Sequence, residues 1–295
     1  MSTSLPRLAF AGIGLMGLPM GKRLLAAGYP LTVWNRNPEK CAALVALGAE
    51  QVQERAQLCA QADIILLCLA DTQAVQEVMF AEQGIAAAMT AEQVLVDFSS
   101  IEPAATQAMA QQLLADSGAQ WLDVPVSGGV GGAEAGSLAM MAGGDAQTLA
   151  QVMPVLEQLG QRVTHMGPVG SGQVAKVCNQ MLVACNAMVI AEVVALAEQA
   201  GVDASLLAPA LAGGFADSTP LQILAPQMAA REFEPVKWHV RTLLKDLDMA
   251  VKLSQSHTSA TPMSGLAAQL MRSHAAHGNL AADPATLIKL YRGDS

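Results

Sequence analysis

A strand-like segment runs directly into a glycine-rich turn close to the start of the chain. The apolar segment RLAFAG occupies residues 7–12, and Gly12, Gly14 and Gly17 follow the spacing GxGxxG where a helix-like segment, 17–27, begins. Glycines in this context permit a tight turn and close approach of a pyrophosphate, whose charge meets the helix N-terminus. The alternative is a glycine turn with a structural role alone. The predicted dinucleotide site comprises Gly12, Ile13, Gly14, Leu15, Met16 and Gly17.

The first half of the chain repeats this alternation of short apolar segments and helix-like segments. Several of the apolar segments have no polar face, as expected of parallel strands covered on both sides. The rhythm predicts an α/β fold with a doubly wound sheet, a Rossmann domain. Predicted strands after the first are 30–35, 62–69, 93–99, 120–126, 137–144 and 162–167, and 102–117 is a predicted helix.

The second half has a different character, because no segment after Gly172 reads as a strand. A helix over 172–200 is about 40 Å long at about 1.5 Å per residue. A helix of this length can join two domains and also contact a partner subunit. We therefore predict a dinucleotide-binding domain over 1–168 and an all-helical substrate and dimerisation domain over 169–295, in a homodimer or homotetramer.

Composition excludes several classes of protein. The net charge of -9 and the lack of any Lys/Arg run argue against a nucleic-acid-binding protein, which needs a positively charged surface to pair with phosphates. The longest apolar run, 181–197, is broken by Asn186 and Glu192 and is shorter than the roughly 20 residues of a membrane span, so we interpret it as a buried helix. The five cysteines form no CxxC pair, which favours a reducing compartment, and we expect a cytoplasmic protein. The five histidines lack the spacing of a metal site, and no metal is predicted.

Residues after the second predicted strand bear on which dinucleotide binds. An NAD-selective site usually has Asp or Glu there to accept hydrogen bonds from the ribose hydroxyls, whereas this chain has Asn35 and Arg36. Without the carboxylate a 2′-phosphate is not repelled, and an arginine can pair with it. NADP is therefore favoured over NAD. Alternatively, Arg36 stacks on the adenine, which serves either cofactor.

Four segments, GIGLMGLPM, DVPVSGGVGGAEAG, GSGQVAKVCNQ and LLKDLDMA, occur in this order along the chain. Their sequence and spacing resemble the β-hydroxyacid dehydrogenases, the family of 3-hydroxyisobutyrate dehydrogenase, tartronate semialdehyde reductase and glyoxylate/succinic semialdehyde reductases. The resemblance spans essentially the whole chain. It implies a Rossmann domain, a long interdomain helix, an all-α C-terminal domain and a substrate cleft between the domains.

The resemblance also assigns roles to residues. It implies that Ser127, Gly128 and Gly129 hold the substrate carboxylate, and a hydroxyl beside glycine N–H groups does suit an anion. It implies that Lys176 is the catalytic residue, which without the family reads as a solvated charge at a helix start. Asn179 and Gln180 share a helix face with Lys176 and are positioned to hold the substrate oxygen. Many family members have Asn where this chain has Gln180.

Further site residues come from the last motif and from the ends of two predicted strands. The resemblance implies that Lys245 closes over the nicotinamide, that Asp246 orients the catalytic lysine or its neighbours, and that Trp238, where Phe is usual, borders the substrate. Arg241 either reshapes the pocket or is simply exposed. Ligands in open α/β sheets lie outside the carboxyl ends of strands, which places Leu69, Ala70 and Ser100 against the nicotinamide.

The function implied is an NAD(P)-dependent dehydrogenase of EC 1.1.1 type that interconverts a small aldehyde acid and its hydroxy acid, with Lys176 as general acid and base. Tartronate, methylmalonate and succinic semialdehydes and glyoxylate are the candidate substrates. Two alternatives stay open. An imine reductase shares the fold but usually lacks the lysine, and a non-catalytic dinucleotide-binding protein would not need it.

Overall fold

The computed structural model describes residues 5–291 and contains two compact units, the first ending at Lys176 and the second beginning at Val177. The division falls inside helix α7 (Ser171–Gln199), and the domain boundary between residues 168 and 169 stays a prediction. The first turn of α7 hydrogen-bonds to the sheet, as described below.

The first unit is built on one nine-stranded sheet in the order β3-β2-β1-β4-β5-β6-β8-β7, with β9 paired to β8. The neighbours from β3 to β6 are all parallel, which confirms the doubly wound fold. The predicted strand 120–126 is divided, because β6 ends at Asp123 and β7 pairs antiparallel with β8. The strands are β1 (Leu8–Ala11), β2 (Leu31–Trp34), β3 (Glu50–Gln51), β4 (Ile64–Leu67), β5 (Val94–Asp97), β6 (Gln120–Asp123), β7 (Val126–Ser127), β8 (Leu138–Gly143) and β9 (Gly160–Gly167).

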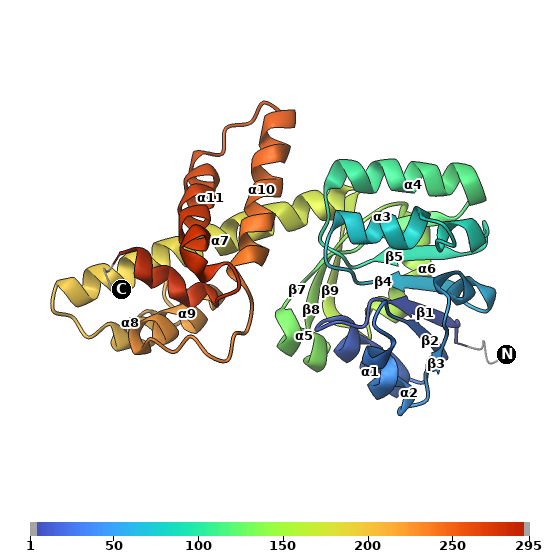
Figure 1. Ribbon diagram of the computed structural model, residues 1–295, viewed down its shortest axis with the longest axis horizontal. Helices are drawn as coiled ribbons and strands as arrows, with labels where there is room; N and C mark the ends of the chain where they lie inside the picture. Colours follow the sequence, from blue (N-terminus) through green and yellow to red (C-terminus); the bar gives the residue numbers. More distant parts are fainter. Residues whose placement is uncertain (1–4, 292–295) are drawn as a thin grey trace. The chain divides into compact units, whose positions relative to one another are not determined.

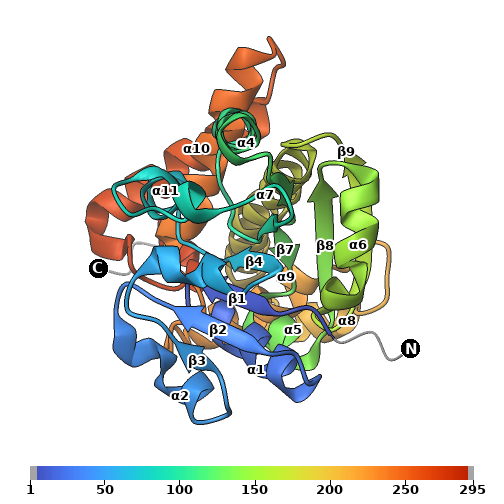
Figure 2. The same ribbon diagram turned by 90° about the vertical axis from the view of Figure 1, so that its right-hand side faces the viewer.

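Helices cover both faces of this sheet (Figures 1 and 2). Successive side chains of β1 alternate between two cores: Leu8 and Phe10 pack with α1, α2 and α6, while Ala9 and Ala11 pack with α3 and α4. This explains why the strands are apolar throughout. The helices are α1 (Gly17–Ala26), α2 (Ala42–Val45), α3 (Thr72–Phe80), α4 (Pro103–Ser117), α5 (Gly129–Ala135) and α6 (Ala146–Leu156), with 3-10 turns at Pro38–Cys41, Arg55–Ala60 and Ala86–Ala88.

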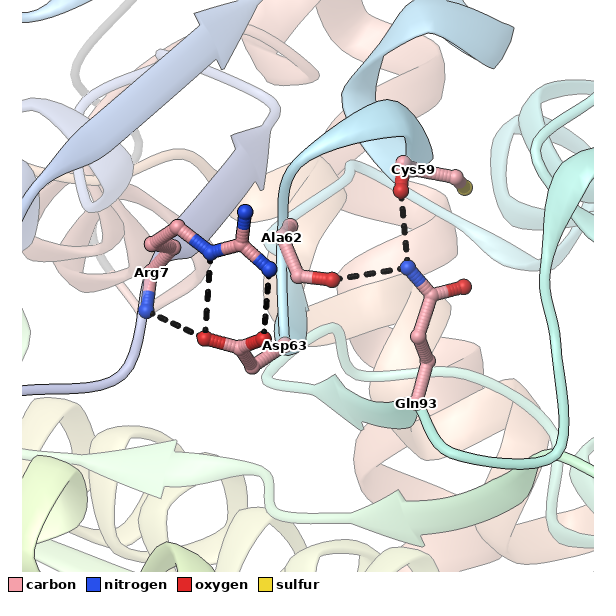
Figure 3. A network of polar contacts seen from close by, with 5 residues as sticks. All are labelled: Arg7, Cys59, Ala62, Asp63 and Gln93. Carbon is pink, nitrogen blue, oxygen red and sulfur yellow. Dashed lines mark hydrogen bonds and ion pairs between the residues drawn. The ribbon is translucent and has the colours of Figure 1, made fainter.

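Side-chain hydrogen bonds fasten the amino ends of the parallel strands (Figure 3). Before β1, the Arg7 guanidinium donates to Asp63, which precedes β4, with Nη2 2.9 Å from Oδ1. The buried Gln93 amide, just before β5, donates to the carbonyl oxygens of Cys59 at 2.8 Å and Ala62 at 2.7 Å. These contacts tie neighbouring strands together at the edge of the sheet opposite to their carboxyl ends.

The second unit is helical. Its core forms where α7 packs against α9, α10 and α11, for example through Ala184, Leu224, Leu247 and Met271. Among the described residues, α7 is the one helix long and apolar enough to cross a membrane, and one side of it packs in this core while another side is exposed. The remaining helices are α8 (Leu207–Leu211), α9 (Thr219–Ala230), α10 (Val240–Ser256) and α11 (Pro262–His274), with 3-10 turns at Ala204–Leu206 and Pro284–Leu290 and a π turn at Ala275–Asn279.

Candidate active site

The glycine turn joins β1 to α1 at the carboxyl end of the sheet. Gly12 has φ +102, and a Cβ there would collide with the carbonyl oxygen of Cys68 at the end of β4. A Cβ on Gly17 would collide with the Gly12 carbonyl oxygen, whereas a Cβ on Gly14 would have no protein atom within 4 Å. Gly12 and Gly17 are therefore required by the packing of the turn, whereas the space next to the Gly14 Cα is open.

The N-terminus of α1 has no side-chain cap. The Leu18 N–H donates to the Gly14 carbonyl oxygen at 3.1 Å and Pro19 has no N–H, so it is the positive end of the helix dipole that favours an anion here. Together with the room at Gly14, this fits the pyrophosphate of a dinucleotide. Ile13 is buried, Leu15 is exposed and Met16 is half-buried, so the turn presents backbone together with the Leu15 side chain.

Asn35 and Arg36 follow β2 and differ in their contacts. The Asn35 side chain braces the glycine turn, because its Oδ1 accepts from the Ile13 N–H at 3.0 Å and its Nδ2 donates to the Asn37 carbonyl oxygen at 2.8 Å. Arg36 is exposed. The end of β2 therefore offers a guanidinium and no carboxylate at the position where a ribose is expected.

The loops after β4 and β5 are tied to each other. The Leu69 N–H donates to Ser99 Oγ at 2.9 Å, and the Ser99 N–H donates to Asp97 Oδ1 at 2.9 Å. Ser100 is half-buried next to this contact, and Ala70 is exposed. The three positions predicted to face the nicotinamide thus lie on two loops that share hydrogen bonds.

Buried carboxyl groups beneath these loops were not among the predicted site residues. Asp97 ends β5, Asp123 ends β6, and the two are register partners with no exposed surface. Burial raises the pKa of Asp97 to about 7 and that of Asp123 to about 6, against hydrogen bonds that lower both. A single Asp at the last position of an apolar strand is the sequence signal that identifies them.

The predicted carboxylate-binding segment lies at the turn from β7 into α5. Ser127 is half-buried, whereas Gly128 and Gly129 are exposed and have φ +138 and +61. Two successive glycines in the left-handed region leave backbone N–H groups uncovered by side chains, a geometry suited to an anion.

The predicted catalytic residues lie on α7. Lys176 and Asn179 are half-buried and Gln180 is buried. Asn179 Nδ2 donates to Gln180 Oε1 at 2.8 Å. One turn of helix relates Lys176 to both amides, as the sequence spacing requires.

Gln180 belongs to a polar cluster within the second unit. Its Nε2 donates to Oδ2 of Asp246 on α10 at 2.5 Å, and Asp246 is 2% exposed. Lys245 Nζ lies 3.4 Å from Asp246 Oδ1. The Asp246 carboxylate thus contacts both the Gln180 amide and the Lys245 ammonium.

The remaining sequence predictions have simple structural outcomes. Trp238 is half-buried against the helical core, and Arg241 is exposed. The ring of buried His274 hydrogen-bonds to Thr286 Oγ1 at 2.8 Å, and burial lowers its pKa to about 4. Within residues 5–291 no three His, Cys, Asp or Glu side chains gather into a metal-binding group.

The fold and the glycine turn define a nicotinamide-dinucleotide oxidoreductase of the Rossmann class. Residues 7–167 match the family described as the NAD binding domain of 6-phosphogluconate dehydrogenase, and residues 170–291 match that of NAD-binding of NADP-dependent 3-hydroxyisobutyrate dehydrogenase. The chain belongs to the β-hydroxyacid dehydrogenase family and is an NAD(P)-dependent enzyme of EC 1.1.1 type.

Individual relatives agree over nearly the whole chain. The 2-hydroxy-3-oxopropionate reductase of Escherichia coli is 36% identical, covering 96% of each chain. The 3-hydroxyisobutyrate dehydrogenase of Pseudomonas aeruginosa is 34% identical, covering 97% of this chain and 98% of the relative. The solved structure of Mycobacterium tuberculosis 3-hydroxyisobutyrate dehydrogenase with L-serine is 29% identical, has a TM-score of 0.87, and is matched over 98% of this chain and 100% of that chain.

Proposed function

We propose that this enzyme interconverts a small aldehyde acid and its hydroxy acid, with Lys176 as the general acid and base. Tartronate, methylmalonate and succinic semialdehydes and glyoxylate are the candidate substrates, and the names of the two relatives above favour the first two. The observation that carries the proposal is the lysine on α7, one turn from two amides of which one is fixed by a buried carboxylate.

The substrate is held at two points in this proposal. Its carboxylate binds the Ser127 hydroxyl and the N–H groups of Gly128 and Gly129, two exposed residues without side chains at the turn into α5. Its reacting oxygen accepts hydrogen bonds from the Asn179 or Gln180 amide, which stabilises charge on that oxygen. Trp238 borders the same substrate, and Asp246 keeps the Gln180 amide oriented.

Lys176 moves the proton. When bound, the cofactor supplies or accepts the hydride at the substrate carbon. In reduction the Lys176 ammonium donates a proton to the carbonyl oxygen and gives the hydroxy acid, and in oxidation the Lys176 amine removes that proton.

We propose NADP rather than NAD as the preferred cofactor. Residues that would hold it are Gly12 to Gly17 for the pyrophosphate, Asn35 and Arg36 for the adenosine half, and Leu69, Ala70, Ser100 and Lys245 for the nicotinamide half. The choice of NADP is supported by the exposed Arg36 guanidinium and by the engagement of Asn35 with the glycine turn. A 2′-phosphate has a cation to pair with, and no carboxylate there selects for the ribose hydroxyls.

We further propose a cytoplasmic homodimer or homotetramer. All five cysteines are free thiols, which suits a reducing compartment. On the second unit, α7 exposes the apolar side chains of Leu182, Val189, Val193 and Leu196, which recur at helical spacing along one face. Such an exposed apolar stripe marks a protein interface.

One set of rate measurements tests the enzymatic proposal. Initial rates are measured on the four aldehyde acids and their hydroxy acids, each with NADPH and NADH, for the wild type, Lys176→Ala and the control Lys22→Ala, an exposed lysine on α1. We expect turnover to fall by about 100-fold or more in Lys176→Ala and to be unchanged in the control. Unimpaired turnover in Lys176→Ala contradicts the role of Lys176, and binding of cofactor without any turnover on the panel favours the non-catalytic alternative.

A further inference from the structure

Asp123, at the end of β6, caps the start of α7. Its Oδ1 accepts from the Gly170 N–H at 2.7 Å and its Oδ2 from the Gln173 N–H at 2.9 Å. The Gly170 N–H lies directly before the helix and the Gln173 N–H lies in its first turn, where the N–H groups have no acceptor within the helix. A carboxylate from a strand that lies 47 residues earlier in the chain therefore satisfies them.

The close approach depends on glycines around the carboxylate. A Cβ on Gly143 would lie 2.5 Å from Asp123 Oδ1, and a Cβ on Gly172 would lie 2.8 Å from Oδ2. Burial of the carboxyl group costs free energy, and the two N–H donors and the positive end of the helix dipole offset part of it.

Gln173 makes a second link from the same turn. Its side chain is 1% exposed. Its Nε2 donates to the Ser99 carbonyl oxygen at 2.8 Å, and its Oε1 accepts from the Ile101 N–H at 3.1 Å. Both partners flank Ser100, which was predicted to face the nicotinamide. The Gln173 side chain thus holds the loop after β5 against the helix.

Lys176 follows Gln173 by three residues, which is about one turn of α7. Whatever fixes the first turn of the helix to the carboxyl ends of β5 and β6 also fixes where the Lys176 backbone stands relative to Ser100. The contacts of Asp123 and Gln173 do this from two sides, through main-chain and side-chain groups.

We propose that Asp123 and Gln173 are positioning residues that set Lys176 at the distance from the nicotinamide loops at which proton transfer keeps pace with hydride transfer. This inference rests on the proposed role of Lys176. Neither residue touches the substrate; both act through the lysine.

A double-mutant cycle tests the proposal. Gln173→Met removes both side-chain hydrogen bonds and keeps the length of the side chain. Asp123→Asn keeps one acceptor and replaces the other by a donor facing an N–H group. Each change is made in the wild type and in Lys176→Ala. The control is Gln107→Met, which removes one exposed contact, from Nε2 to the Val169 carbonyl oxygen at 3.3 Å, just before α7.

We expect kcat of the wild-type background to fall by about 10- to 100-fold in each variant, since misplacement of a catalytic group by about 1 Å can cost about 100-fold. The KM for the cofactor should change by less than about twofold, and in the Lys176→Ala background each change should lower kcat by less than about twofold. The Gln107→Met control should leave kcat unchanged. Rates are expressed per folded protein from thermal melts, and Gln173→Asn, whose amide is one methylene shorter and carries no charge, replaces Gln173→Met if that variant does not fold.

Two results overturn the proposal: wild-type kcat in Gln173→Met, or the same loss of kcat with and without Lys176. If Lys176→Ala itself turns over like the wild type, the proposed function fails instead. Slow turnover of Lys176→Ala with normal turnover of Gln173→Met removes only the positioning role.

Discussion

The three glycines of the turn after β1 should respond differently to the same substitution by alanine. Gly12 combines φ +102 with a Cβ position that collides with the Cys68 carbonyl oxygen. The left-handed backbone costs an L residue about 1–2 kcal/mol, and an overpacked site adds about 1–3 kcal/mol. Gly12→Ala should therefore lose about 2–5 kcal/mol, a large fraction of the about 5–15 kcal/mol that stabilises a typical protein.

Gly14→Ala should leave stability nearly unchanged, because its φ lies outside the left-handed region and a Cβ there meets no protein atom within 4 Å. Alanine also restricts the unfolded chain, which can add about 0.4–1 kcal/mol. The new methyl group occupies the space that we assign to the pyrophosphate. We expect cofactor affinity to fall by about tenfold or more, equivalent to about 1.4 kcal/mol.

Gly48 provides a matched control. It has φ +103, almost the same as Gly12, but a Cβ there would have no protein atom within 4 Å. Gly48→Ala therefore measures the backbone term alone, and the difference in stability between Gly12→Ala and Gly48→Ala gives the cost of the collision at Cys68.

The assay combines thermal melts with calorimetric titration of NADPH. At about 2–4 °C per kcal/mol for a domain of this size, Gly12→Ala should lower Tm by roughly 10 °C and Gly48→Ala by a few degrees. Gly14→Ala should change Tm by about 2 °C or less, in the direction of higher Tm if it changes at all. If Gly14→Ala melts as early as Gly12→Ala, or binds NADPH as tightly as the wild type, the division of roles among the glycines is wrong.

Three further changes test other parts of the structure. Burial raises the pKa of Asp97 to about 7, with Cys68 and Asp123 nearby, so the folded state holds a proton that the unfolded chain releases near its ordinary value of 3.8. The stability that protonated Asp97 contributes is complete below about pH 4 and is lost as pH rises to 7. Over that range the free energy of unfolding of the wild type, measured in urea, should fall by on the order of 4 kcal/mol relative to that of Asp97→Asn. If the two free energies change with pH in parallel, this reasoning is refuted. Arg36→Ala should raise the KM for NADPH by about 10-fold or more and leave that for NADH within about twofold, whereas an equal rise for both supports stacking on the adenine instead. For the proposed homo-oligomer, Leu182→Glu with Leu196→Glu should give a monomer in light scattering, and Leu47→Glu, an exposed position just after α2, serves as the control. A mass unchanged from that of the wild type contradicts a subunit interface on this face of α7.

Much of the fold was predictable because burial leaves a direct signal in the sequence. Strands β1, β4 and β5 are apolar on both faces, and each was expected within about two residues of its observed bounds. Strand β3 has only two residues, Glu50 and Gln51, with no periodicity to detect. The predicted strand 120–126 is divided because Val126 and Ser127 pair with Met140 and Ala139 of β8. This pairing depends on residues distant in sequence, so the local pattern does not reveal it.

The candidate site was predictable only in part. The glycine turn and the segment around Lys176 on α7 have local sequence patterns. Asn35 and Arg36 could be assigned because they follow β2, at the position that usually lies beside the ribose. The roles of Asp123 and Gln173 depend on partners about 50 and 74 residues away, so no spacing rule reveals them. The same holds for Gln180, whose hydrogen bond to Asp246 spans 66 residues.

The carboxyl ends of the central strands show where stability gives way to another requirement. Strands β1 and β4 end in buried Ala11 and Leu67, whereas β5 and β6 end in buried Asp97 and Asp123. Apolar residues at those two ends would avoid burial of two carboxyl groups, which the raised pKa values show to be unfavourable. The end of β6 is linked to the start of α7 directly, by the hydrogen bonds of Asp123. The Ser99–Ile101 loop after β5 is linked to the first turn of α7 by the side chain of Gln173. If Lys176 has the catalytic role proposed above, stability is given up at the edge of the sheet that places it, the pattern expected of a site maintained for its chemistry.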